Sequence, residues 1–250
     1  MTEQDLAGRR AVVTGGASGI GLACAEEFAA RGAHLVIADF NGDAAHEVAQ
    51  RLGGEAWVVD LSATEALDDL SLDADILVNN AGVQTVAPIT EFSPERFRFM
   101  QRLMVESPFL LIRAVLPGMY ERGWGRIINI SSAHGLRASA YKSAYVTAKH
   151  ALEGLSKVTA LEGGPHGVTS NCINPAYVRT PLVEKQIADQ ASVHGIAEDE
   201  VVEKIMLTES VIKRLIEPTE VASLAGWLAS DHAGMVTGAS YTMDGGWTAR

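Results

Sequence analysis

Short runs of apolar, often β-branched residues alternate along the chain with longer amphipathic segments. Most of the short runs are apolar at successive positions, which is typical of strands covered on both faces. The segments between them, such as IGLACAEEFAARG and VASLAGWLASDHAG, have helical periodicity and end near glycine. The pattern predicts seven strands, at residues 11–15, 34–39, 55–60, 75–80, 125–131, 168–174 and 239–244.

The regular alternation of strand and helix predicts the fold. Strands joined by helices form a parallel sheet with right-handed crossovers, so that helices cover both faces. We therefore expect one doubly wound α/β domain over residues 1–250. Residues 181–216 interrupt the alternation with a helical pattern of mixed polarity. Insertions near strand ends often cover a site, so we predict a helical lid; the alternative is a surface hairpin without a role.

Composition narrows the possible partners and compartments. Of the 250 residues, 47% are hydrophobic and 20% are charged, which allows a large core. The formal charge of −11 argues against nucleic acid or an anionic membrane surface as a partner. Cys24 and Cys172 suggest no disulfide framework. The start MTEQDLAGRR lacks the apolar core of a signal peptide, and no apolar run approaches a membrane span. We expect a soluble cytoplasmic protein, and we predict no metal site.

The first predicted strand runs into TGGASGIGLACAEEF, where Gly15, Gly19 and Gly21 have the spacing G-x-x-x-G-x-G. This turn suits a pyrophosphate, because backbone without Cβ atoms approaches it closely and a helix start offers unpaired N–H groups. A tight strand–helix turn needs glycine in any case, but its place at the first strand favours dinucleotide binding of the Rossmann type. Ser18 and Ile20 flank Gly19 and belong to the predicted cofactor-binding set.

Two carboxylates follow later strands. Asp39 ends the second strand and can accept hydrogen bonds from both ribose hydroxyls, although a strand-end Asp can also simply cap a turn. No Arg or Lys follows it in DFNGDAA to neutralise a 2′-phosphate, so the pattern favours NAD over NADP. Asp60, next to Leu61, is the expected partner of the adenine. The fourth strand ends in NNAG, where Asn80, Ala81 and Gly82 are expected to shape the crevice.

The residue types needed for proton transfer lie further along. Ser132 follows the fifth strand, and Tyr145 and Lys149 are one turn apart on a predicted helix. A phenol titrates near ~10, and a neighbouring ammonium lowers that value by favouring the phenolate. The pair can then take a proton from an alcohol or return one to an alkoxide. A Tyr-x-x-x-Lys pair alone also arises by chance on helix surfaces.

With TGGASGIG, NNAG, Ser132, YVTAK and NPAYVRTP, the chain resembles the short-chain dehydrogenase/reductase family over essentially all 250 residues. The resemblance implies hydride transfer between nicotinamide C4 and a carbinol or carbonyl carbon. It assigns the general acid/base to Tyr145, its activation and a ribose contact to Lys149, and the substrate-oxygen contact to Ser132. It also implies a homotetramer, and it places near the cofactor Asn80, Pro175, Val178 and Thr180.

Four polar residues around this framework suggest a substrate: Gln84, His134, Lys142 and Gln186. Each has an ordinary explanation as a loop or solvent-facing residue, but together they suit a carboxylate. Within the family, SAHGLRASAYKSAYVTAKH, VRTPLVEKQI and DGGWTAR resemble a bacterial subfamily that oxidises (R)-3-hydroxybutyrate to acetoacetate with NAD⁺. That likeness implies that the four residues hold the carboxylate. Trp247 would wall the methyl end together with Tyr177, where the subfamily usually has tryptophan.

The chain also departs from the family pattern. Met104 aligns with an asparagine that helps to hold a water in the proton relay, and Ala176 replaces a glycine. We therefore expect a working but slow dehydrogenase. Two alternatives remain open: a family member that acts on a 3-oxoacyl thioester or a sugar, and an NAD-binding sensor without turnover.

Overall fold

As the sequence predicts, seven strands form one parallel sheet, and their order is β3-β2-β1-β4-β5-β6-β7. The computed structural model describes residues 4–181, 183–184, 187, 191 and 196–249. The strand order reverses between β1 and β4, which creates a crevice at the carboxyl ends of the strands. The strands are β1 (Arg10–Thr14), β2 (His34–Asp39), β3 (Glu55–Val58), β4 (Ile76–Asn79), β5 (Gly125–Ile130), β6 (Val168–Pro175) and β7 (Ser240–Met243).

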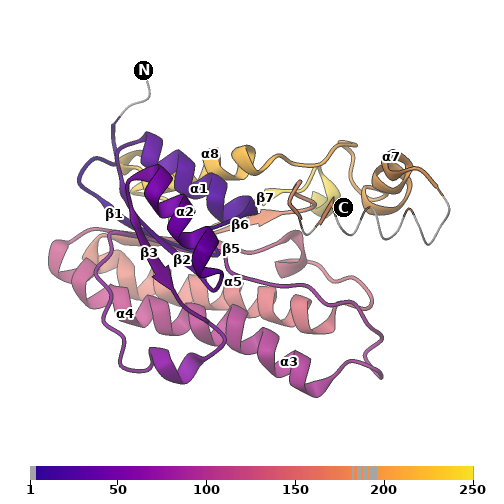
Figure 1. Ribbon diagram of the computed structural model, residues 1–250, viewed down its shortest axis with the longest axis horizontal. Coiled ribbons are helices and arrows are strands. Elements are labelled where there is room, and N and C mark those ends of the chain that lie inside the picture. Colours follow the sequence, from indigo (N-terminus) through magenta and orange to yellow (C-terminus); the bar gives the residue numbers. More distant parts are fainter. Residues whose placement is uncertain (1–3, 182, 185–186, 188–190, 192–195, 250) are drawn as a thin grey trace.

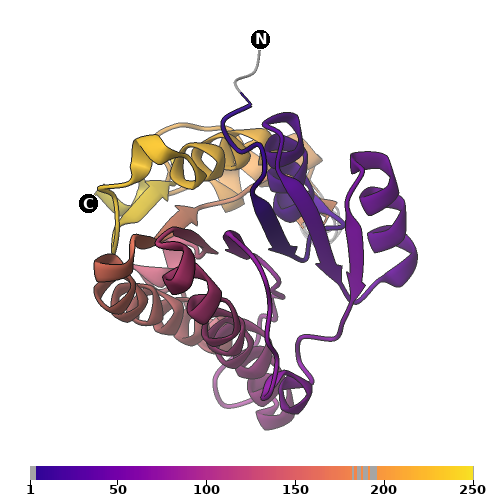
Figure 2. The same cartoon turned by 90° about the vertical axis from the view of Figure 1, so that its left-hand side faces the viewer.

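Helices cover both faces of the sheet, which confirms the doubly wound α/β fold. Figure 1 shows α1, α2 and α8 above the sheet and α3, α4 and α5 below it. Figure 2 turns the same layers by 90°, with α8 in yellow on the opposite side of the sheet from the pink and magenta helices. The helices are α1 (Gly19–Ala30), α2 (Gly42–Leu52), α3 (Pro94–Gln101), α4 (Ser107–Arg122), α5 (Ser143–Gly163), α7 (Glu198–Val201) and α8 (Pro218–Ala229).

Two apolar cores lie on the two faces of the sheet. Neighbouring strand residues point to opposite faces, so Val13 packs with Phe28 of α1 and Val221 of α8 in one core. Val12 packs with Val115 of α4 in the other core. This explains why the strands are apolar at successive positions.

Residues 94–122 form one continuous helical stretch with a π-helical turn, η2 (Arg102–Glu106), between α3 and α4. Among the described residues it is the one helix long and apolar enough to cross a membrane by length and composition, with a mean hydropathy of 1.3 in its most apolar window. The expectation that no segment approaches such a span is therefore too strong. The apolar character has a packing reason, because Leu111, Val115 and Met119 are buried in the core.

The segment predicted as a lid is closed at its base. Val178 and Ile216 form an isolated parallel bridge, and the amide of Arg179 donates to the Ile216 carbonyl oxygen at 2.8 Å. The described part of the segment contains α7 and a second π-helical turn, η5 (Val202–Met206), and it has its own small apolar cluster. In Figure 1, α7 lies to the right of the sheet.

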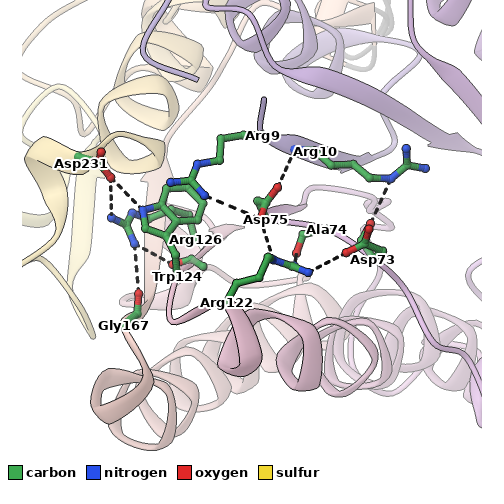
Figure 3. A network of polar contacts seen from close by, with 11 residues as sticks. Arg9, Arg10, Asp73, Ala74, Asp75, Arg122, Trp124, Arg126, Gly167 and Asp231 are labelled. Carbon is green, nitrogen blue, oxygen red and sulfur yellow. Dashed lines mark hydrogen bonds and ion pairs between the residues drawn. The ribbon is translucent and has the colours of Figure 1, made fainter. Parts of the chain in front are cut away.

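A polar network fixes the amino ends of neighbouring strands, away from the crevice (Figure 3). The Trp124 ring lies between two guanidinium groups, 3.6 Å from that of Arg9 and 4.3 Å from that of Arg126. Asp75, just before β4, pairs with the Arg122 Nε at 2.9 Å and accepts the backbone N–H of Arg10 at 2.9 Å. Because the network joins β1, β4 and β5, it holds in register the strands whose other ends carry the site.

Candidate functional site

One cavity of about 610 Å³ gathers almost every residue that the sequence singles out. It lies where β1, β2, β4, β5 and β6 end, and Pro181 and Val183 of the predicted lid segment contribute to its wall. Two predicted residues are not among its lining: Gly21, which packs against the glycine turn, and Gln186, which lies outside the described residues. The predicted residues that line it are Gly15, Ser18, Gly19, Ile20, Asp39, Asp60, Leu61, Asn80, Ala81, Gly82, Gln84, Ser132, His134, Lys142, Tyr145, Lys149, Pro175, Val178 and Thr180.

The glycine turn brings backbone to the cavity in conformations that other residues rarely adopt. Gly15 and Gly19 have φ angles of 61° and 52°. Gly21 has a packing role, because a Cβ there would lie 2.1 Å from the Gly15 carbonyl oxygen and 2.6 Å from Asn80 Nδ2. It allows α1 to begin directly against the turn. Asn80 fixes the same turn, since its Nδ2 donates to the carbonyl oxygens of Thr14 at 2.9 Å and Gly15 at 3.2 Å.

The two predicted carboxylates lie at the far end of the cavity. The Asp39 carboxylate accepts backbone N–H groups from Ala17 at 3.1 Å and Asn41 at 3.0 Å, so it ties the glycine turn to β2. Asp60 accepts both the N–H and the hydroxyl of Ser62, and these hydrogen bonds lower the pKa of Asp60. Phe40, which sequence reasoning missed, also lines this end and is 81% exposed.

The cavity's opposite end brings together Ser132, Tyr145 and Lys149. Ser132 follows β5 and its hydroxyl accepts the backbone N–H of His134 at 3.1 Å, which fixes the loop. The Lys149 ammonium is buried and donates to the Ile130 carbonyl oxygen at 2.7 Å, and it lies 5.5 Å from the centre of the Tyr145 ring. Burial lowers the pKa of Lys149 to about 8.

The expected lowering of the Tyr145 pKa is not found, because the pKa of this phenol is raised. Burial raises the pKa of Tyr145, and a side-chain hydrogen bond with Ser132 only partly offsets that rise. The physical reason is that the phenolate loses more hydration free energy on burial than its neighbours in the protein give back as hydrogen bonds and charge interactions. The sequence identifies the neighbouring cation but not the depth at which the phenol lies.

The predicted substrate residues that the structure describes surround the same end. His134 has serine partners at both ring nitrogens, Ser132 Oγ at 3.4 Å and Ser139 Oγ at 3.0 Å. Burial, and then the charges of Lys142 and His150, lower the pKa of His134 to about 4, so its ring is neutral near pH 7. The Gln84 Oε1 atom is buried and has no hydrogen-bond partner among the described residues.

Two aromatic residues of the cavity contact different polar residues: Tyr177 contacts Lys142, and Trp247 contacts His134. The Lys142 Nζ donates to the Tyr177 hydroxyl at 3.5 Å, so the phenol lies beside this cation. Trp247 packs edge-on against the His134 ring, with 5.1 Å between ring centres. The Asp244 carboxylate holds the turn that carries Trp247, because it accepts the Gly246 N–H at 2.9 Å.

Met104 lies inside the π-helical turn and is fully buried. It packs with Met100, Ala148 and Tyr145, and a Cβ added at Gly82 would lie 3.2 Å from its sulfur. The thioether therefore fills the space between the NNAG segment and the helix that carries Tyr145, and it offers no strong hydrogen bond there.

The charged and metal-binding groups of the cavity limit its chemistry. Lys142 and Lys149 are the cations among the described lining residues, and both lie at the Tyr145 end. Among the described residues, no group of three or more His, Cys, Asp or Glu side chains is placed to hold a metal ion. The cavity thus combines a backbone-lined turn, two carboxylates at one end and a hydroxyl–phenol–ammonium cluster at the other.

Comparison with known proteins agrees with this geometry. A family model described as enoyl-(acyl carrier protein) reductase matches residues 15–248. The chain belongs to the short-chain dehydrogenase/reductase family. This short-chain dehydrogenase is 45% identical to the D-beta-hydroxybutyrate dehydrogenase of Rhizobium meliloti, over 97% of this chain and 99% of that protein. It is 44% identical to the enzyme of the same name from Cupriavidus necator, over 98% and 100%.

Solved structures of the family are also similar. The structure of L-sorbose reductase from Gluconobacter frateurii, complexed with NADPH and L-sorbose, has a TM-score of 0.92 and 33% identity, and 99% of each chain is covered. This short-chain dehydrogenase is therefore an oxidoreductase that uses a nicotinamide cofactor.

Proposed function

We propose that the protein oxidises (R)-3-hydroxybutyrate to acetoacetate, reversibly, with NAD⁺ as the hydride acceptor. The observation that carries the proposal is the joint presence, in one cavity, of Ser132, Tyr145 and Lys149 with the polar side chains of His134 and Lys142. The two D-beta-hydroxybutyrate dehydrogenases, at 45% and 44% identity, support the same substrate.

The residues present fit a dinucleotide. Backbone of the glycine turn lines the cavity at Gly15 and Gly19, both of which have positive φ angles. The turn packs so closely on the start of α1 that there is no room for a Cβ at Gly21. The turn and the start of α1 would hold the pyrophosphate, and Asp39 would hold the adenosine ribose. The bound nicotinamide supplies the hydride-accepting carbon. Because the described cations of the lining lie at the other end of the cavity, a 2′-phosphate beside Asp39 would be unpaired, which supports NAD over NADP.

Tyr145 would remove the substrate's hydroxyl proton. Its pKa is raised by burial, so it needs added positive charge to ionise, and the Lys149 ammonium lies 5.5 Å from the centre of its ring. Ser132 would hold the substrate oxygen next to the phenol, because its hydroxyl lines the same end of the cavity and acts to lower the pKa of Tyr145. In the reverse direction the phenol returns the proton to the alkoxide.

The substrate carboxylate would bind at Lys142. Its ammonium has three donors, of which the structure uses one on Tyr177 at 3.5 Å. Gln84 and neutral His134 would add hydrogen bonds without adding charge, and Gln186 would complete the set. A carboxylate held at one end fixes which face of the carbinol carbon is presented, which favours one enantiomer.

A sugar or another polyol is a second candidate substrate. The similarity to L-sorbose reductase, at 33% identity, favours this alternative. Lys142 argues for the hydroxy acid, because a half-buried cation gains more from a carboxylate than from a neutral hydroxyl. L-Sorbose therefore belongs in the same assay as the hydroxy acids.

We also propose a cytoplasmic homotetramer. Three apolar side chains are exposed on the outer faces of α4 and α5: Phe109 is 50%, Val158 51% and Leu161 79% exposed. Such a face suits a contact between copies of the chain. Light scattering after gel filtration measures the mass directly, and a monomer of 26.6 kDa would contradict the proposal.

One assay tests the proposed reaction. NADH formation is followed with (R)-3-hydroxybutyrate, (S)-3-hydroxybutyrate and a 3-hydroxyacyl thioester, each with NAD⁺ and with NADP⁺, and L-sorbose reduction is followed with NADH and NADPH. We expect turnover with the (R)-acid and NAD⁺ to exceed every other combination by at least roughly tenfold, the effect of about 1.4 kcal/mol. Equal or faster turnover of the thioester or the sugar would overturn the substrate proposal, and a preference for NADP⁺ would overturn the cofactor proposal.

A further inference from the structure

Glu153 is a buried carboxylate behind the candidate active site that does not line the cavity. It is 5% exposed and lies on α5 one turn after Lys149. Its Oε1 accepts a hydrogen bond from Asn174 Nδ2 at 2.6 Å, and its Oε2 accepts one from the Ser240 hydroxyl at 2.6 Å. Both carboxyl oxygens therefore act as hydrogen-bond acceptors.

The same carboxylate is connected to the loop that carries Ser132. The Nδ2 of Asn174 also donates to the Ser132 carbonyl oxygen at 2.9 Å, so a single amide joins Ser132 to Glu153. The loop packs tightly against the carboxylate, because a Cβ added at Gly135 would lie 2.9 Å from Glu153 Oε1. Through these contacts α5, the end of β6, the start of β7 and the Ser132 loop meet at one group.

A buried carboxylate also needs a positive partner. Burial lowers the pKa of Lys149, while Cys172 and Glu153 act in the opposite direction. Cys172 lies on β6, and burial raises the pKa of its thiol far above its usual range, so it is neutral near pH 7. Tyr145, on α5, is also uncharged there. Among the described groups that act on Lys149, Glu153 is thus the carboxylate, and it lies one helical turn away on the same side of α5.

We propose that Glu153 is a positioning residue of the active site, which holds the Ser132 loop through Asn174 and supplies the countercharge of Lys149. The inference rests on the proposed dehydrogenase function and extends it to a residue that touches neither substrate nor cofactor. It predicts two separable effects: one on the geometry of Ser132, and one on the charge of Lys149.

Three variants separate these effects. Glu153→Gln keeps the shape and removes the charge, Asn174→Ala breaks the connection to Ser132 but keeps the charge, and Ser240→Ala removes one hydrogen bond from the carboxylate. Each is compared with the wild type in NADH binding, followed by fluorescence from pH 6 to 10, and in kcat/KM over the same range. Thermal melting shows whether each variant is folded.

The expected results differ between the variants. In the wild type, NADH binding weakens as pH rises through the pKa of Lys149, about 8. In Glu153→Gln the charged form of Lys149 loses its partner. The alkaline limb of the binding curve, where NADH affinity falls, therefore moves to lower pH by about one unit. Asn174→Ala should lower kcat without moving the limb, and Ser240→Ala should leave the limb where it is.

A Glu153→Gln curve with the wild-type midpoint would overturn the proposed countercharge. If Glu153→Gln does not fold, Glu153→Asp serves instead: it keeps the charge, so its limb should match the wild type, and a limb shifted to lower pH would contradict the inference. An unchanged kcat in Asn174→Ala would overturn the connection to Ser132. Wild-type protein that binds NADH but oxidises no hydroxy acid would overturn the proposed function, while the binding curves would still decide the role of Glu153. Wild-type protein that binds no NADH would overturn both.

Discussion

Replacing Lys142 with methionine separates binding of the carboxylate from the chemistry. Methionine has a similar reach and keeps the apolar part of the side chain, but it loses the ammonium. Lys142 lies in the cavity and donates to the Tyr177 hydroxyl at 3.5 Å. In the variant this hydroxyl loses a donor but can still donate its own proton in a hydrogen bond. Burial lowers the pKa of Lys142, and a bound carboxylate would favour the charged ammonium again.

The size of the effect follows from the lost interaction. A hydrogen bond to a charged group contributes about 1.5–3 kcal/mol. At about 1.4 kcal/mol for each factor of ten, kcat/KM for (R)-3-hydroxybutyrate should fall roughly 10- to 150-fold in Lys142→Met. The loss should be mainly in KM, because the contact is present in both the ground state and the transition state.

Initial rates of NADH formation measure this, with butan-2-ol as a neutral substrate that has no carboxylate. Lys157→Met is the matched control, because Lys157 is exposed on the same helix and does not line the cavity. The acid should lose rate in Lys142→Met alone, and butan-2-ol should be unaffected in both variants. Equal losses for the acid and for butan-2-ol would refute the assignment of Lys142 to the carboxylate.

Three further outcomes follow from the structure. Gly21→Ala should abolish NADH binding and lower the melting temperature, because the new methyl would lie 2.1 Å from the Gly15 carbonyl oxygen; binding at wild-type affinity would contradict this. Met104→Asn should raise kcat by restoring a relay partner and lower stability by about 1–3 kcal/mol because it buries an amide; an unchanged or lower kcat would show that Met104 does not impair the relay. His134 has a pKa of about 4, below its usual 6.5, so the unfolded chain binds its proton first as pH falls; the free energy of unfolding should drop by about 3 kcal/mol from pH 6.5 to 4, and denaturant melts of His134→Gln should show a smaller drop.

The sheet and its cavity could be predicted because they depend on local signals. Strands apolar at successive positions, glycines after the first strand and polar residues after the strand ends all leave marks in the sequence. The carboxyl ends of parallel strands meet at one edge, so Asp39 and Ser132 fall in the same cavity without any knowledge of the packing.

Other features depend on packing that the sequence does not reveal. Glu153 follows Lys149 by four residues, a spacing typical of a solvated pair on a helix surface. Only its partners on β6 and β7, Asn174 and Ser240, show that it is buried. Tyr177 could be placed in the cavity from its position after Pro175, but not beside Lys142, because that contact joins segments 35 residues apart.

The π-helical turn around Met104 is a similar case. Its sequence, RLMVE, contains neither Gly nor Pro, and nothing in its pattern distinguishes it from an ordinary helix. The turn becomes visible only where α3 and α4 pack against α5.

The most direct measurement compares the wild type with Tyr145→Phe in NADH binding and in oxidation of (R)-3-hydroxybutyrate. The variant keeps the ring and loses one oxygen. We expect NADH binding to stay within a few-fold of the wild type, while kcat falls by about 10²–10⁴-fold. Turnover that survives in Tyr145→Phe at the wild-type rate would contradict the assignment of proton transfer to this phenol.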